Sequence, residues 1–312
     1  MAGSIRSMRK IPAFFVVACL AALLTPSSNA QRRISESSPL DTLGKNPSQE
    51  TGWEILKRFR SFGWDGGYHW RVQLKNMPRR EKTWYLNGEI YGDRLDRGPI
   101  SRIDIVEQPI DVDENGNQIE KRVLRLLLQS GQNSYAMGKR TGEAGPPFVF
   151  DSEAALEPIA GSEFSLFDLL APFVYWPKFR YEGRTTFRGS PTHLFWMYPP
   201  EEDSLLNERI GGVRIFINDQ FNVLTQTEIF DTGKTKLKTI YIIGVDKADG
   251  QTIFRELDVR NEVTRDKTRL KILDAKMGLE LPTSLFTAQS LMDDLQNQTI
   301  PIVRQEAFEL LQ

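Results

Sequence analysis

The residues with the most suggestive spacing for metal chemistry lie in one acidic turn. Asp111, Asp113 and Asn115 occupy positions 1, 3 and 5 of a calcium-binding loop, and Gly116 occupies position 6. Position 12 of such a loop requires a bidentate Glu, but it is Arg122 here. The segments on either side alternate like strands rather than helices. A hairpin turn is therefore the better interpretation of this segment.

Two short segments match part of a catalytic or phosphate-binding motif but lack other residues that the motif requires. Residues 230–233 (FDTG) resemble the catalytic triplet of aspartic proteases, whose chemistry needs two carboxylates that share a proton. The sequence has no second copy of that triplet. Residues 233–235 (GKT) end like a phosphate-binding loop, but Glu228 stands where the first Gly of the loop belongs. Neither motif predicts an activity.

Other reactive side chains are sparse in this sequence. It has two histidines, His69 and His193, and one cysteine, Cys19. Two isolated histidines do not form a usual structural zinc site, and the sequence has no Gly-x-Ser-x-Gly nucleophile elbow. We therefore expect no catalytic residue, no metal and no cofactor, and we interpret the chain as a non-enzyme. A hydrolase that uses paired carboxylates stays open, because such pairing cannot be recognised without geometry.

Strands joined by tight turns must position whatever site the chain has. Between residues 213 and 274, apolar side chains recur at every second position, as at Val213, Ile215 and Ile217. Turns rich in Asp, Asn and Gly separate these runs, which predicts antiparallel strands joined by hairpins. The chain contains about a dozen such strands with about three or four short helices. This favours a mainly β fold (α+β) built on one large curved antiparallel sheet that closes towards a barrel, with a β-sandwich as the alternative.

Two of the expected strands are apolar on both faces, namely residues 123–128 (VLRLLL) and 239–245 (TIYIIGV). One face of an antiparallel sheet is often exposed to water. Either a helix covers the second apolar face, or that face lines a ligand cavity. The sequence leaves both alternatives open.

The N-terminal residues have the pattern of a targeting segment. Residues 1–30 combine three basic side chains, an apolar run at 11–24 and a small-residue site at 28–30. We predict a signal peptide that is cleaved after Ala30, and thus an exported, periplasmic protein. An uncleaved membrane anchor and a lipid anchor at Cys19 are the alternatives. The 40 Lys and Arg balance 41 Asp and Glu, so the composition gives no sign of a nucleic-acid partner.

The order of elements resembles that of the outer-membrane lipoprotein-sorting proteins, the LolA-like family. The resemblance covers roughly residues 50–295, and its motifs are diffuse. It rests on the segment FSLFDLL at 164–170, the turn Gly189-Ser190-Pro191, the stretch from residue 213 into Phe230-Asp231-Thr232-Gly233-Lys234, and the closing segment LPTSLFT at 281–287. From it we predict a LolA-like half-barrel domain at 51–296. The polar composition of residues 31–50 predicts a flexible lead-in before this domain, and the apolar spacing at 297–312 predicts a C-terminal amphipathic helix after it.

The resemblance implies a fold and a function. The expected fold is an incomplete β-barrel with a helical lid (LolA/LolB-like) over an apolar cavity. The implied function is that of a periplasmic carrier, which binds lipid or the acyl chains of lipoproteins for transfer toward the outer membrane. Its partners would be those acyl chains, an inner-membrane release complex and an outer-membrane acceptor. The alternative is a non-enzymatic, exported, β-rich structural or interaction module of an envelope complex.

The strands that follow the expected lid supply the candidate lining of such a cavity. A one-residue error in register would move any strand residue to the other face of the sheet. The predicted lining residues are Trp176, Phe179, Phe187, Phe195 and Met197.

Overall fold

The computed structural model describes residues 47–107 and 122–292, together with the backbone of Val303 and Arg304. The chain divides into two units at residue 38, and the first unit lies outside the described residues. Everything below concerns the second unit alone. Several predictions fall outside the described residues: the signal peptide, the Cys19 anchor, the lead-in up to residue 46 and most of the calcium-like turn. Of the predicted C-terminal helix, the structure describes only the two residues of β14 (Val303–Arg304), which pair with β13.

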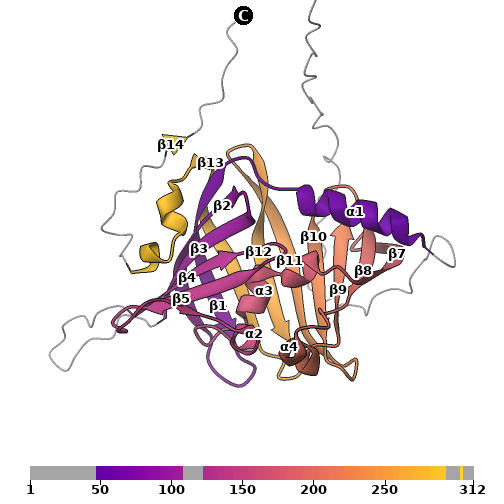
Figure 1. Cartoon of the computed structure of the whole chain (residues 1–312), viewed down its shortest axis with the longest axis horizontal. Coiled ribbons are helices and arrows are strands. Elements are labelled where there is room, and N and C mark those ends of the chain that lie inside the picture. Colours follow the sequence, from indigo (N-terminus) through magenta and orange to yellow (C-terminus); the bar gives the residue numbers. More distant parts are fainter. Residues whose placement is uncertain (1–46, 108–121, 293–302, 305–312) are drawn as a thin grey trace, which may run out of the picture. The chain divides into compact units, whose positions relative to one another are not determined.

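One antiparallel sheet makes up most of the described chain (Figure 1). The strands run in the order β6-β5-β4-β3-β2-β1-β13-β12-β11-β10-β9-β8-β7. Their bounds are β1 (Gly67–Met77), β2 (Trp84–Leu95), β3 (Gly98–Val106), β4 (Val123–Gln129), β5 (Tyr135–Arg140), β6 (Phe148–Val149), β7 (Phe179–Phe187), β8 (Ser190–Met197), β9 (Gly212–Asn218), β10 (Leu224–Phe230), β11 (Lys236–Ala248), β12 (Gln251–Asn261) and β13 (Lys267–Glu280).

This order explains why the sheet is an incomplete barrel. Chain neighbours pair as hairpins from β1 to β6 and from β7 to β13, and β1 then pairs with β13 to join the two series. Among the described strands, β6 and β7 each have one partner strand, so they are the two free edges of the sheet. The prediction of a curved, unclosed antiparallel sheet is confirmed, and the sandwich alternative is wrong.

Short helices accompany the sheet. Their bounds are α1 (Gln49–Ser61), α2 (Ser152–Leu156), α3 (Leu166–Leu170) and α4 (Ser204–Arg209), with 3-10 turns η1 (Pro172–Tyr175), η2 (Thr283–Phe286) and η3 (Gln289–Leu291). Helix α3 begins at a capping box, in which the Ser165 and Asp168 side chains each accept from the other's backbone N–H. It ends at Ala171, whose φ of 47° is left-handed and stops the helix before Pro172.

The connecting segment, residues 150–178 between β6 and β7, fills the concave face of the sheet. In Figure 1, α3 lies within the curve of the strands. Its Leu166 is fully buried, and Phe173 of η1 is 1% exposed. Both belong to one apolar cluster with inward residues of the strands, such as Phe195 and Ile215. The interior is therefore packed largely by the chain's own side chains.

A different segment covers the convex face of β2–β4. Leu127 of β4 belongs to a second apolar cluster with Leu285, Phe286 and Leu291, which follow β13. Arg102 is fully buried beside this cluster, where it donates to the Asp104 carboxylate and, at 2.6 Å, to the Ser290 carbonyl. The two apolar faces of residues 123–128 are thus both covered by protein. The other segment predicted to be apolar on both faces, residues 239–245 of β11, is not fully covered, because Val245 is 62% exposed.

Candidate functional site

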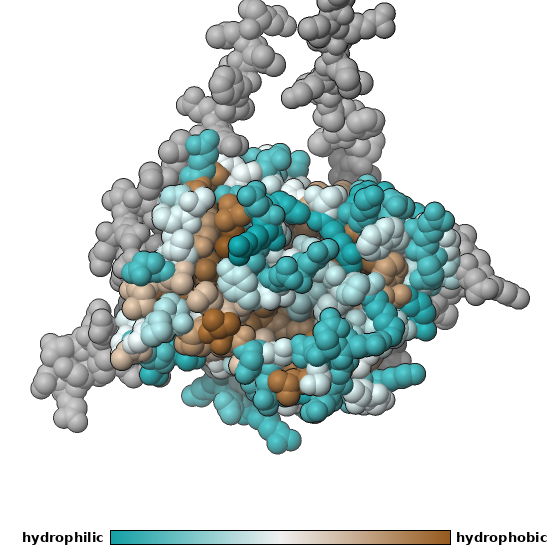
Figure 2. Space-filling model, in the orientation of Figure 1, coloured by the Kyte–Doolittle hydropathy of each residue, from teal (hydrophilic) through white to brown (hydrophobic). Residues whose placement is uncertain are grey.

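Two pockets flank the turn η1 inside the curve of the sheet. We call them the α1 pocket, of about 240 Å³, and the α4 pocket, of about 280 Å³. Tyr175 lines both, so η1 forms the wall between them. Figure 2 shows apolar patches among polar ones on the face that carries α1 and α3, with a hollow between them.

The α1 pocket is walled mainly by aromatic and aliphatic side chains. They come from the end of α1, the loop after it, β1, the start of β3 and η1, and the end of β2 adds charged residues. Trp64 is fixed there by its indole N–H, which donates to the Thr252 carbonyl at 2.9 Å, and by edge contacts with Tyr68 and Trp70. The apolar lining residues are Phe59, Phe62, Trp64, Tyr68, Pro99, Val174 and Tyr175, and the charged ones are Arg60, Asp93 and Arg94.

Two arginines of this pocket fasten α1 to its surroundings. Arg60 donates from Nε to the Val174 carbonyl at 2.8 Å and from an Nη to the Trp176 carbonyl at 3.0 Å. Arg94 donates to the carbonyls of Phe62 and Arg60, each at 3.2 Å. The end of α1 is therefore tied to η1 on one side and to β2 on the other. We call the Arg60 pair of bonds the Arg60 tether.

Electrostatics at the wall between the pockets reflect partial loss of water. Burial raises the pKa of the Tyr175 hydroxyl, and the positive charges of Arg94 and Arg60 oppose that shift. Burial also lowers the pKa of the Arg60 guanidinium. Both groups are thus drawn out of water at the same place.

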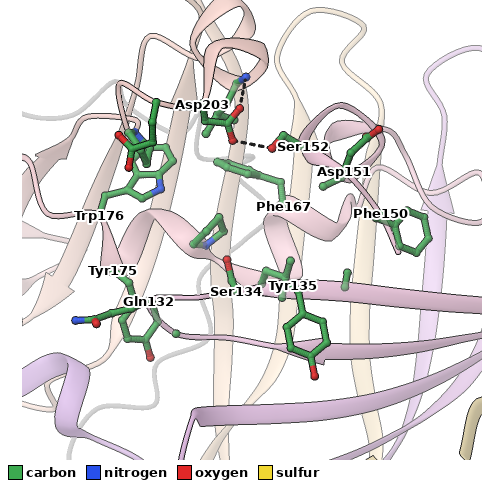
Figure 3. Close-up of a pocket in the computed structure, with 18 of the residues that line it drawn as sticks. Gln132, Ser134, Tyr135, Phe150, Asp151, Ser152, Phe167, Tyr175, Trp176 and Asp203 are labelled. Carbon is green, nitrogen blue, oxygen red and sulfur yellow. Dashed lines mark hydrogen bonds between the residues drawn. The ribbon is translucent and has the colours of Figure 1, made fainter. Parts of the chain in front are cut away.

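The α4 pocket lies on the other side of η1 and has a more polar lining (Figure 3). Phe167 and Trp176 form its apolar side. Asp203 lies opposite, where its carboxylate accepts from the Ser152 hydroxyl at 2.6 Å and from the Leu206 N–H at 3.0 Å. Those bonds cap α4 and join it to α2.

The predicted lining residues fall in different places. Trp176 lines the α4 pocket, while Phe195 and Met197 are fully buried in the concave core. Phe179 is partly buried against that core, where its ring meets Phe195 at 6.0 Å. Phe187 instead meets Phe216, with ring centroids 4.9 Å apart.

The separate position of Phe187 has a physical reason. Phe216 alternates with Ile215 and Ile217 of the concave core, so Phe216 and Phe187 lie on the convex face. The β7–β8 register shifts between Tyr181 and Gly183, and this bulge reverses the faces of the residues beyond it. A role of the other residues in lining a lipid cavity stays a prediction.

Sequence reasoning missed the polar residues of the α1 pocket. Arg60 had one usable signal, since it lies four positions after the buried Leu56 on α1 and so shares its face. Arg94 and Tyr175 had none, because they meet α1 only through the curvature of the sheet. Among the described residues, no group of three or more His, Cys, Asp or Glu could hold a metal ion. No helix within the described ranges is both long and apolar enough to span a membrane.

Comparison with known proteins gives matches to solved structures. A family model described as an uncharacterized protein matches residues 150–293. No curated protein matches the chain.

Three solved structures have a similar fold. A putative outer membrane lipoprotein-sorting protein domain from Vibrio parahaemolyticus is 15% identical, with a TM-score of 0.65 over 79% of this chain and 100% of that one. A DUF1329 family protein from Desulfovibrio piger is 12% identical, with a TM-score of 0.64 over 78% and 98%. A LolA superfamily protein from Nitrosomonas europaea is 13% identical, with a TM-score of 0.55 over 77% and 98%.

Proposed function

The chain has the LolA-like fold, and from that premise we propose that it is an exported carrier that holds the acyl chains of a lipid or lipoprotein. One observation carries the proposal. The aromatic α1 pocket borders a concave core that is covered by the connecting segment, and side-chain bonds rather than strand pairing hold that segment to α1. Such a cover can move without breaking the sheet.

The size of the pockets determines how a carrier of this kind would work. Sites for drug-sized ligands usually measure about 300–1,000 Å³. The α1 pocket, at about 240 Å³, is below that range. A complete acyl chain therefore requires the connecting segment to shift, which would join the two pockets at Tyr175.

The energy of cargo burial is sufficient for such a shift. An acyl chain of about 16 carbons gains on the order of 12 kcal/mol on leaving water, at about 0.8 kcal/mol per CH₂. The Arg60 tether consists of two hydrogen bonds from a charged group, each contributing about 1.5–3 kcal/mol. Cargo burial exceeds the cost of breaking the tether. The shift also uncovers buried side chains of the connecting segment, such as Phe173, so an open loaded state requires the acyl chain to cover that apolar surface again.

A carrier of this kind needs no catalytic group. Among the described residues, the arrangement nearest to a catalytic triad is the chain Tyr181–His193–Asp219, with contacts of 2.8 and 3.0 Å. It lines neither pocket, and Tyr181 is buried against Gly52 of α1. We interpret it as a structural network, which supports a non-enzymatic function.

The location and the partners belong to the same proposal. We propose cleavage after Ala30 and a periplasmic carrier that receives cargo from an inner-membrane release complex and passes it to an outer-membrane acceptor. Acylation at Cys19 would instead anchor the same domain to a membrane.

A second candidate function has its own support. The concave core is filled by side chains with little or no exposure, such as Leu166, Phe173 and Phe195. A packed interior favours an exported β-rich interaction module that carries no ligand.

One experiment separates the two candidates. The protein is expressed with its own N-terminus, purified from the periplasm without detergent, and analysed by mass spectrometry for co-purified lipid and for cleavage after Ala30. Uptake of a fluorescent fatty acid is then measured for wild type and for Gly63→Leu. This substitution places a side chain beside Arg94 in the α1 pocket. Lys57→Ala, on the exposed face of α1, is the control. A carrier loses uptake in Gly63→Leu alone, whereas absence of lipid and of uptake in every form favours the interaction module.

A further inference from the structure

The charged residues of the α1 pocket are unlike most arginines of this fold. Arg71, Arg214 and Arg269, for example, pair with carboxylates across the sheet. Arg60 and Arg94 form no ion pair with any carboxylate of the described residues, and the hydrogen bonds of their guanidinium groups all go to carbonyl oxygens. The Arg60 guanidinium also lies over the Trp53 ring, 5.5 Å from its centroid. A guanidinium has five N–H donors, so each has donors left for another acceptor.

A third donor faces the same pocket. Tyr175 lines it, and within the described part of the chain its hydroxyl has no hydrogen-bond partner. Arg60, Arg94 and Tyr175 all line this one pocket. The single carboxylate of the lining, Asp93, already accepts from the backbone N–H of Arg94 at 2.7 Å. The pocket thus combines an apolar interior with a net positive rim.

Such a rim has a specific chemical complement. Arg94 is exposed and Arg60 is partly buried, so an anion at the mouth of the pocket can reach both guanidinium groups. Guanidinium groups match the planar oxygens of carboxylates and phosphates, and bonds between such ions are the strong ones. A neutral head group can accept a hydrogen bond from either guanidinium, but it supplies no charge opposite to theirs.

We propose that Arg60, Arg94 and Tyr175 bind the anionic group of an amphiphile, a carboxylate or a phosphate, whose hydrocarbon chain enters the α1 pocket. The inference rests on the proposed carrier function and narrows its cargo. A cargo with an acidic head group is selected over a neutral one of the same chain length, because hydrogen bonds from a guanidinium to an anion are stronger than those to a neutral oxygen.

Three ligands that share one hydrocarbon chain test this selection: decanoate, decyl phosphate and 1-decanol. Binding is measured below the micelle concentration by calorimetry and by the change in intrinsic tryptophan fluorescence, to which Trp64 in the pocket lining contributes. We expect at least one anion to bind about tenfold more tightly than 1-decanol, with the preference falling as salt is added. The tighter of the two anions identifies the head group as carboxylate or phosphate.

Variants assign the preference to these residues. Arg94→Gln is expected to remove the preference for the anion, measured as the ratio of anion to 1-decanol affinity in the same variant. Tyr175→Phe, which folds without any change of packing volume, is expected to weaken anion binding about fivefold. Arg94→Lys keeps the charge and is expected to restore part of the preference. Arg97→Gln, an exposed residue of the β2–β3 turn outside the pocket lining, is the matched control.

The outcomes separate this inference from the function on which it rests. Equal affinity for all three ligands overturns the anion site and leaves the carrier function standing. An equal loss in Arg94→Gln and Arg97→Gln also overturns it, since the effect would then be general surface charge. Failure of every ligand to bind overturns both.

Discussion

The side-chain amide of Gln49 pairs with both backbone groups of Tyr181, accepting from its N–H at 2.7 Å and donating to its carbonyl at 3.0 Å. Tyr181 belongs to β7, a free edge of the sheet. The amide thus occupies the place of a neighbouring strand at that position. Unpaired strand edges attract other chains, and α1 protects this one while being held against it.

Loss of this amide pair should loosen α1 without unfolding the sheet. We expect Gln49→Ala to lower the free energy of unfolding by about 1–3 kcal/mol, because two hydrogen bonds are lost. Hydrogen exchange should become faster in residues 49–61 and at Tyr181, with β1 and β13 unchanged. Lys57→Ala, exposed on the same helix, should have neither effect. Uniformly faster exchange throughout the sheet would contradict a local role for Gln49.

The Arg60 tether should control how quickly the connecting segment opens. Arg60→Met keeps the apolar stem but leaves the carbonyls of Val174 and Trp176 without their donor. We expect a loss of about 3 kcal/mol in unfolding free energy, the lower end for two hydrogen bonds from a charged group, and faster uptake of a neutral ligand such as 1-decanol. Stopped-flow fluorescence measures the uptake. Arg58→Met, two positions earlier and more exposed, should keep the wild-type rate, and an equal change in both variants would argue against the tether.

Acid should weaken the network that joins β7, β8 and the turn after β9. A hydrogen bond from His193, together with the charge of Arg184, holds the pKa of the Asp219 carboxyl below its usual value. Arg58 lies 3.9 Å away on α1. Because the folded pKa is lower than the unfolded value of about 3.9, this stabilisation is complete above that pH and disappears as the pH falls through the folded pKa.

Comparison of wild type with Asp219→Asn tests this sign. The difference in their unfolding free energies should stay constant from neutral pH to about pH 4 and shrink only below it. Urea titrations at a series of pH values measure it, with Glu54→Gln on the exposed face of α1 as the control. A difference that already vanishes near pH 6 would assign the stabilisation to another group.

Much of the sheet was predictable because its signals are local. Alternation at Val213, Ile215 and Ile217 reflects one buried face, and all three are buried in β9. The order of non-adjacent elements was not predictable in this way. The apolar outer face of β4 is covered by η2 and η3, which are far away in sequence.

The candidate site was less predictable, for two physical reasons. A single bulge in β7 carried Phe187 to the convex face, and a bulge leaves no sign in the pattern of apolar residues. The α1 pocket forms where α1, β2 and η1 meet, so the partners of Arg94 depend on tertiary structure alone. Helix α4 had a local signal, because Asp203 caps its first turn.

The convex face should contribute stability but not cargo binding. Arg102→Met removes a fully buried charge and leaves Asp104 with a weaker partner, Arg125 at 3.9 Å. Breaking a buried ion pair on one side costs about 3–5 kcal/mol, so we expect a clear loss of stability in urea. The double variant with Asp104→Leu should recover part of it. At a temperature where both variants stay folded, their affinity for ligand should equal that of wild type. A loss of affinity in a folded variant would show that the convex face also takes part in ligand binding.

The contact between Gly52 and Tyr181 gives the most direct test of a movable α1. A Cβ at Gly52 would lie 2.5 Å from the Cβ of Tyr181, closer than real atoms approach, so Gly52→Ala must push α1 away from β7. Alanine in a helix is intrinsically better than glycine by about 0.5–1 kcal/mol, so any net loss of stability reports the clash. We expect such a loss, faster hydrogen exchange along α1 and faster ligand uptake with an intact sheet. Thr51→Ala is the control, because Thr51 is the exposed neighbour of Gly52. This change also raises helix propensity but adds no contact with Tyr181, so the unfolding free energy should rise slightly or stay the same. The contrary outcome is a Gly52→Ala protein that is more stable than wild type and takes up ligand at the wild-type rate. In that case α1 adjusts without opening the pocket, and the connecting segment alone would form the lid.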